Sequence, residues 1–200
     1  WNEEQTEATR HLIGRDVQVE WIDEDGEESE LNYRVPNVNK CQSCHSDDGE
    51  MALLGPRTRQ LNRTFDYQDG PNNQIEQFVN RDLLDSEPPA TGQLPKLPSP
   101  KNKQKSVSKR AKAYLEANCA HCHNPTGGAS NSGLFLQYQQ DDPQKRGICK
   151  QPVAAGPGTG GNQYDIKPGY PEQSIMVFRM NSNEPGVKMP ELPLRTIDTF

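Results

Sequence analysis

The cysteines are the residues of this chain whose spacing most clearly predicts chemistry. Four of the five form two pairs, each followed by histidine: Cys41-Gln42-Ser43-Cys44-His45 and Cys119-Ala120-His121-Cys122-His123. Two cysteines separated by two residues can serve a zinc site, a redox dithiol or a haem, but a histidine directly after the pair indicates c-type haem attachment. Because only 4 histidines occur in 200 residues, two such placements by chance are not expected.

The chemistry of haem attachment explains this spacing. Each cysteine adds to one vinyl group of the haem and forms a thioether, and two intervening residues let both side chains reach the ring from one turn. The adjacent histidine then binds the iron as its proximal ligand. The sequence therefore predicts two haem c groups, with thioethers at Cys41, Cys44, Cys119 and Cys122 and proximal ligands at His45 and His123.

Other uses of the cysteines fit less well. In a four-cysteine zinc site the pairs usually lie about 12–20 residues apart, whereas 74 residues separate Cys44 from Cys119. Two disulfides would leave the histidines unexplained, and a thioredoxin-like dithiol would need a βαβ setting that neither pair has. Cys149 lies outside both motifs, and we expect a buried small hydrophobe, with an intermolecular disulfide or iron ligation as alternatives.

The composition predicts a small core made from protein alone. Hydrophobic residues make up 31% of the chain, and Gly and Pro together account for 33 of 200 residues. No apolar run approaches the ~18 residues of a membrane span. Two large apolar cofactors would supply the missing core.

The charge is unevenly distributed along the chain. Residues 1–100 carry 20 acidic and 9 basic side chains (net −11), and residues 101–200 carry 8 acidic and 13 basic (net +5). The acidic half disfavours nucleic acid, and the basic half lacks interleaved aromatic residues. We therefore expect no nucleic-acid partner, whereas a molecule with two signs of charge can dock head-to-tail or steer toward a charged partner.

Patterning along the chain predicts four segments. Residues 1–40 form an N-terminal β-hairpin lead-in, because residues 17–22 and 31–35 alternate polar and apolar around a turn at 23–26. Residues 41–85 form the first haem module, with helical spacing over 73–84. Residues 86–105 are a linker rich in Pro and Lys, and residues 106–200 form the second haem module.

Within the second module, a helix is expected from a Ser106 or Ser108 cap to Cys119. Leu134–Tyr138 is the one strand-like piece, and a short helix is expected over Pro171–Met180 with Pro in its first turn. The predicted fold class is mainly α with long loops, made of two haem modules plus the N-terminal hairpin.

Two longer stretches resemble a family of secreted dihaem c-type cytochromes. They run from Val35 through the first motif to Asn62 and Asn73-Gln74-Ile75, and from Arg110 through the second motif to Pro168-Gly169 and Met189-Pro190. Some members of that family are linked to sugar-dehydrogenase-like or β-helix proteins. The resemblance implies class I cytochrome c-like modules and electron transfer.

Candidate distal ligands are methionines and histidines. Met189 lies 66 residues after His123 and resembles the loop methionine of class I cytochromes, so we expect it at haem 2, with Met180 as the alternative. A thioether ligand raises the reduction potential. For haem 1 we expect Met51, and the alternatives are an open iron site, His11, His121 or Met176.

The predicted function is electron transfer between redox partners by a dihaem c-type cytochrome in the periplasm or outside the cell. The first alternative is a dihaem peroxidase-like enzyme with one open iron, in which Arg57, Arg59 or Arg63 could serve near haem 1. The second is a structural electron conduit, as a homo-oligomer, a filament or a subunit of a larger dehydrogenase complex.

Overall fold

The structure is a computed structural model that describes residues 1–23, 25–154, 156–191 and 197. The backbone divides into two compact units, one formed by Trp1–Ala52 with Cys122–Phe200 and the other by Leu53–His121. We call them unit 1 and unit 2 and describe each by itself. Among the described residues, no helix is long and apolar enough to cross a membrane.

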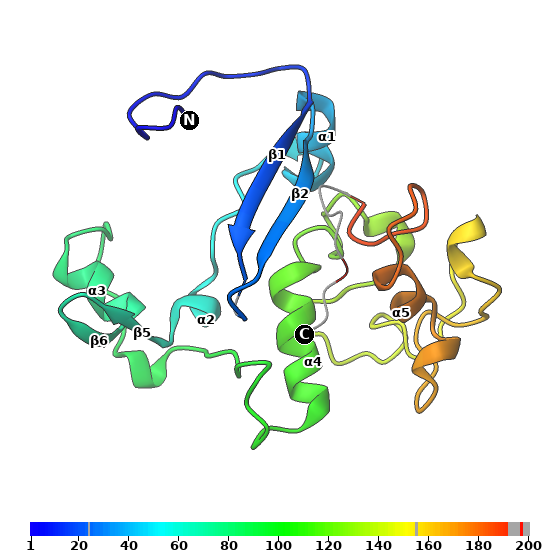
Figure 1. The fold of residues 1–200 in the computed structure, drawn as a ribbon. Coiled ribbons are helices and arrows are strands. Elements are labelled where there is room, and N and C mark those ends of the chain that lie inside the picture. The colour runs from blue at the N-terminus through cyan, green and yellow to red at the C-terminus, as the bar shows by residue number, and fades with distance from the viewer. Residues whose placement is uncertain (24, 155, 192–196, 198–200) are drawn as a thin grey trace. The chain divides into compact units, whose positions relative to one another are not determined.

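Unit 1 begins with the hairpin that the alternating pattern predicts, and this prediction is confirmed. Strand β1 (Arg15–Ile22) pairs antiparallel with β2 (Glu28–Val35), from Arg15 opposite Val35 to Ile22 opposite Glu28 (Figure 1). Gly26 takes a φ of 84° in the connecting turn, which a glycine adopts without steric cost. Pro36, which cannot donate to a ladder, follows the end of β2.

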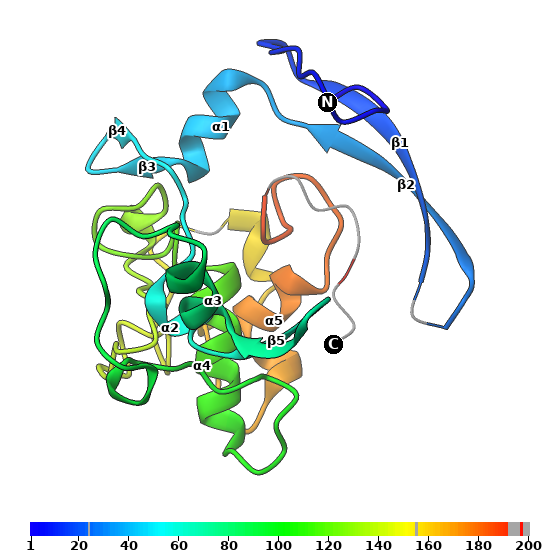
Figure 2. The ribbon, with the colours of Figure 1, turned by 90° about the vertical axis from the view of Figure 1, so that its left-hand side faces the viewer.

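Helix α1 (Val38–Cys44) follows the hairpin and carries the first cysteine pair. The Asn37 side chain caps it by accepting a hydrogen bond from the Lys40 amide at 2.9 Å. The chain then turns through a small hairpin, β3 (Ser46–Asp47) and β4 (Glu50–Met51), as Figure 2 shows. Asp48 and Gly49 connect its strands with φ of 49° and 83°, as a tight two-residue hairpin turn requires.

The remainder of unit 1 consists of loops and short helical turns. These are η2 (Ser130–Ser132), η3 (Gly156–Thr159), η4 (Pro171–Gln173) and α5 (Ile175–Met180). The expected helix over 171–180 is thus present as η4 followed by α5. Leu134–Tyr138 forms no strand. Two separate backbone hydrogen bonds hold this segment instead, from the Phe135 amide to Lys145 O and from the Leu136 amide to His123 O.

Unit 2 holds the longest helix that the structure describes, α4 (Val107–Asn118). Ser106 caps it as predicted, with its hydroxyl accepting from the Lys109 amide. The other elements are α2 (Thr58–Leu61), β5 (Thr64–Tyr67), β6 (Gly70–Asn73), α3 (Gln74–Asn80) and η1 (Thr91–Gln93). Helix α3 is shorter than the predicted 73–84, and two residues after its end Asp82 adopts a φ of 53°, which a helix cannot contain.

Buried polar side chains hold unit 2 together. Asn62, 4% exposed, donates to the carbonyls of Thr91 and Leu94 and accepts from the Asn73 side chain. These bonds tie the Pro-rich segment 86–105 to α2 and the β5–β6 hairpin. Glu116 on α4, with its side chain fully buried, pairs with Arg57 at 3.3 Å and Arg59 at 3.9 Å.

The expectation of a mainly α fold is wrong. The described residues contain five α-helices of four to twelve residues and six strands, which pair as three two-stranded hairpins, so the fold is small and mixed. The reason is local: left-handed residues and proline stop helices early, and tight turns favour hairpins. The buried hydrophobic residues are few, as the composition indicates: Ile75, Ala113, Ala120, Leu136, Ile175 and Val187.

Candidate functional site

The first cysteine pair lies on one face of α1. Cys41 and Cys44 are three positions apart in the helix, and side chains with this spacing are neighbours. Both thiols are half-buried. His45 is the C-cap, and its amide donates to Cys41 O at 2.9 Å. The helix therefore holds the two cysteines, and the backbone of the histidine that follows them, in a fixed arrangement.

The second pair begins where α4 ends. Cys119 is the C-cap of this helix, and its amide donates to Leu115 O at 2.9 Å. Burial raises the pKa of the Cys119 thiol from its ordinary value of 9.0 to about 11, because desolvation disfavours the charged thiolate. Near neutral pH this thiol is therefore protonated.

Within unit 1 the loop after the second motif packs on the end of α1. The Cys122 thiol lies 4.0 Å from Ser43 O, and the Asp48 amide donates to Thr126 O at 3.0 Å. The Thr126 hydroxyl also donates to the Asp47 carboxylate. A side chain at Gly128 would place its Cβ only 2.1 Å from Ser43 O, so the absence of a side chain here permits the approach.

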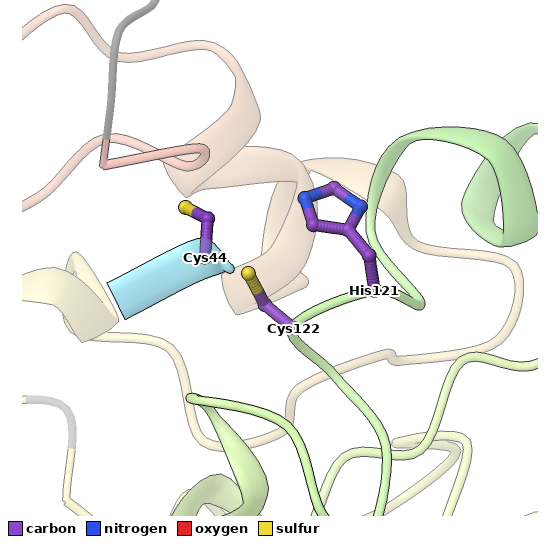
Figure 3. Close-up of side chains that lie close together, drawn as sticks. All are labelled: Cys44, His121 and Cys122. Carbon is purple, nitrogen blue, oxygen red and sulfur yellow. The ribbon is translucent and has the colours of Figure 1, made fainter. Parts of the chain in front are cut away.

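This packing brings one cysteine of each motif together. Figure 3 shows the thiols of Cys44 and Cys122 side by side, with His121 preceding Cys122 in the chain. The two sulfur atoms and an imidazole nitrogen all lie within 4.8 Å of one another, and all three residues are half-buried. Thiolate and imidazole are ligands for soft and borderline metal ions such as zinc.

The His123 ring is held by a serine that the sequence analysis did not identify. The Ser132 hydroxyl lies 3.3 Å from His123 Nδ1, donates its one proton to Ala129 O at 2.6 Å, and accepts from the Leu134 amide. Since that proton is already used, the Ser132 oxygen can only accept from the ring. These contacts place His123 Nδ1 to donate to Ser132, as it does in the tautomer that carries its proton on Nδ1.

Of the expected distal ligands, Met189 belongs to unit 1 together with His123. It is half-buried, and its amide donates to Arg179 O at 3.0 Å, next to the end of α5. Met51 lies on β4 opposite Ser46 and is 57% exposed. The alternatives Met176 and Met180 are half-buried on α5, and His11 is exposed in the segment before β1.

Two further expectations concern residues outside the ligand sets. Cys149 is exposed, with a φ of 54°, so the expectation that it is a buried hydrophobe is wrong. The left-handed turn at Gly147–Cys149 presents the thiol to solvent.

Arg57 and Arg59, which the peroxidase alternative would use, both pair with the buried carboxylate of Glu116.

The donor set in this structure fits haem c. The first motif has its thiols on one helical face with the histidine next in the chain, and in the second the Nδ1 of the histidine lies 3.3 Å from the Ser132 hydroxyl. Sequence reasoning missed Ser132, Gly128, and Lys150, whose ammonium donates to Ser132 O at 2.9 Å and pairs with Asp165 at 3.1 Å. Residues 124–128 (Asn-Pro-Thr-Gly-Gly) are typical of a turn, but nothing in the sequence indicates which residue that turn contacts.

Comparisons with known proteins give no further assignment. Neither protein-family models, nor curated proteins, nor solved structures show a match to this chain.

Proposed function

We propose that this protein is a dihaem c-type cytochrome that carries electrons between redox partners. The observation that carries the proposal is the second motif: His123 follows a cysteine pair, and its Nδ1 lies 3.3 Å from the Ser132 hydroxyl, the arrangement in which Nε2 would be the nitrogen that binds iron. The first motif repeats the same residue order on the face of α1. Two histidines placed in this way support two haem sites.

Each residue of the two motifs has a defined role in this proposal. Cys41 and Cys44 would hold haem 1, and Cys119 and Cys122 would hold haem 2, through thioethers. His45 and Met51 would supply the iron ligands of haem 1, and His123 and Met189 those of haem 2. When bound, the haem supplies an iron that cycles between the ferrous and ferric states and so holds one electron.

The chain's own residues hold these groups and cover them. Helix α1 orders the first set of donors, the end of α4 carries Cys119 of the second, and within unit 1 the loop at Gly128 packs on Ser43 at the end of α1. The exposed large apolar side chains, which include Met51, Leu53 and Leu54 shortly after the first motif in the sequence, supply surface that an apolar cofactor can cover. Periplasmic or extracellular location follows from the place where such haems are attached.

The test of this function is a spectroscopic redox titration of the purified protein. The expected result is the absorption spectrum of reduced c-type haem, reversible cycling of both haems, and no change when carbon monoxide is added to the reduced protein. Such a result means that both irons are six-coordinate. Absence of haem bands contradicts the proposal, and a carbon monoxide complex at one iron favours the peroxidase-like alternative.

A second candidate function rests on the Cys44, Cys122 and His121 group. Three donors within 4.8 Å of one another fit a zinc or similar ion whose fourth position is open. Zinc binding needs free thiolates, whereas haem attachment consumes both thiols. Stoichiometric zinc in protein that carries no covalent haem would establish this second function and exclude the first.

A further inference from the structure

A second layer of residues lies behind the proximal histidine of haem 2. Ser132 ends the η2 turn, and the next residue, Gly133, closes the turn with a φ of 63°. The hydroxyl of Ser132 faces His123, as described above, and its backbone carbonyl accepts a hydrogen bond from Lys150 Nζ at 2.9 Å. Ser132 thus links the axial ligand to a charged side chain on another loop.

Lys150 is itself held by a buried carboxylate. Its ammonium group pairs with Asp165 Oδ2 at 3.1 Å, and the two side chains are 16% and 6% exposed. Its remaining donors are engaged by Ser132 O and by Gln151 O at 3.3 Å. All three N–H groups of the ammonium therefore have acceptors, and the charge is neutralised where it is buried.

The backbone of Asp165 is fixed by hydrogen bonds on both sides. The Asp165 amide donates to Lys150 O at 2.8 Å, and its carbonyl accepts from the Met176 amide in the first turn of α5 at 3.0 Å. The chain from α5 through Asp165, Lys150 and Ser132 to His123 is continuous, and every link lies in unit 1. This arrangement determines where the Ser132 oxygen sits relative to the imidazole.

We propose that Ser132, held by the Lys150–Asp165 pair, is a positioning residue for His123 that fixes its ring orientation and lowers the reduction potential of haem 2. This inference rests on the proposed function. A hydrogen bond accepted from Nδ1–H makes the imidazole a stronger donor through Nε2. A stronger donor favours ferric over ferrous iron, and the potential of that haem falls.

The test compares Ser132→Thr with Ser132→Val in the haem-loaded protein. The two side chains have nearly the same shape, but only Thr keeps the hydroxyl acceptor. The potentials of both haems are measured by equilibrium titration, and the ring protons of the ligating histidines are measured by NMR of the ferric form. Ser130→Ala, in the same η2 turn, is the control that should leave both potentials unchanged.

The expected result is a higher potential for one haem in Ser132→Val, with shifted ring-proton signals from one histidine, and potentials in Ser132→Thr close to those of the parent. Equal potentials in the two variants overturn the inference, as does an equal shift of both haems. Loss of haem from Ser132→Thr also overturns it, because that variant retains the acceptor. If the parent protein carries no covalent haem, the proposed function itself fails.

Discussion

At the scale of single residues, the two exceptional thiols are Cys119 and Cys149. Cys119 has a pKa of about 11 because it is buried, whereas Cys149 is exposed. The thiolate is the reactive form of cysteine. The reactivity of these two thiols is therefore expected to differ strongly, although both lie in loops or at helix ends.

In haem-free protein, we expect iodoacetamide to modify Cys149 much faster than Cys119 at pH 8, as measured by peptide mass spectrometry. Equal modification rates at pH 8 would contradict the burial of the Cys119 thiol.

The raised pKa of Cys119 also predicts how the stability of the folded haem-free chain depends on pH. The contribution of the protonated thiol is fully present below pH 9 and is lost as the pH rises through about 11. Cys119→Ala should remove this loss of stability at alkaline pH.

A second prediction at this scale concerns Met189. Replacing it with Ala removes the thioether expected at haem 2, so one of the two reduced haems should bind carbon monoxide and its potential should fall. Met51→Ala should have the same effect on the other haem. Absorbance titration with carbon monoxide measures both. A Met189→Ala protein that binds none would exclude this residue as a ligand.

At the scale of elements, the close approach of the α1 end to the second motif loop depends on Gly128. Gly128→Ala would place a carbon 2.1 Å from Ser43 O, so we expect about 1–3 kcal/mol of destabilisation by overpacking and reduced haem content. Gly55→Ala is the matched control, because its added Cβ meets nothing within 4 Å. Urea unfolding measures the difference, and equal stabilities of the two variants would contradict the packing described here.

The ion pairs of Glu116 are the corresponding element-scale feature of unit 2. Glu116→Ala removes a buried acceptor shared by Arg57 and Arg59, and the loss of charged hydrogen bonds should cost about 1.5–3 kcal/mol. The control is Asp16→Ala, which breaks the exposed pair with Arg34 and should cost less than about 1 kcal/mol. A smaller effect at Glu116 than at Asp16 in thermal unfolding would refute the assignment.

The elements that the sequence predicted are those with strong local signals. The β1–β2 hairpin follows from strict alternation, and α4 follows from its Ser106 cap and helical pattern. The β3–β4 hairpin was missed although Asp48-Gly49 is a typical turn pair, because its strands have only two residues each. The mainly α expectation failed because such short elements leave little periodicity to detect.

The candidate site was predictable only where its residues are consecutive. The two motifs specify their own cysteines and histidines within five residues each. By contrast, Ser132, Lys150 and Asp165 come from separate loops, and only the three-dimensional structure shows that they stand behind His123. Neither does the spacing in sequence indicate that Cys44 and Cys122 approach each other.

At the scale of the whole molecule, the main feature is the small number of buried hydrophobic side chains among the described residues. Six hydrophobic residues are buried there, while large apolar side chains such as Trp1, Ile13 and Leu53 are more than half exposed. A 200-residue chain normally buries considerably more. Two covalently attached apolar cofactors would supply that missing interior, which is why composition and motifs lead to the same proposal.

The most direct test of this proposal is the intact mass of the purified, denatured protein together with its count of reactive thiols. The proposal predicts the mass of the polypeptide plus two haems and a single reactive thiol, Cys149, because the other four cysteines are thioethers. The mass of the bare polypeptide with five reactive thiols would contradict it.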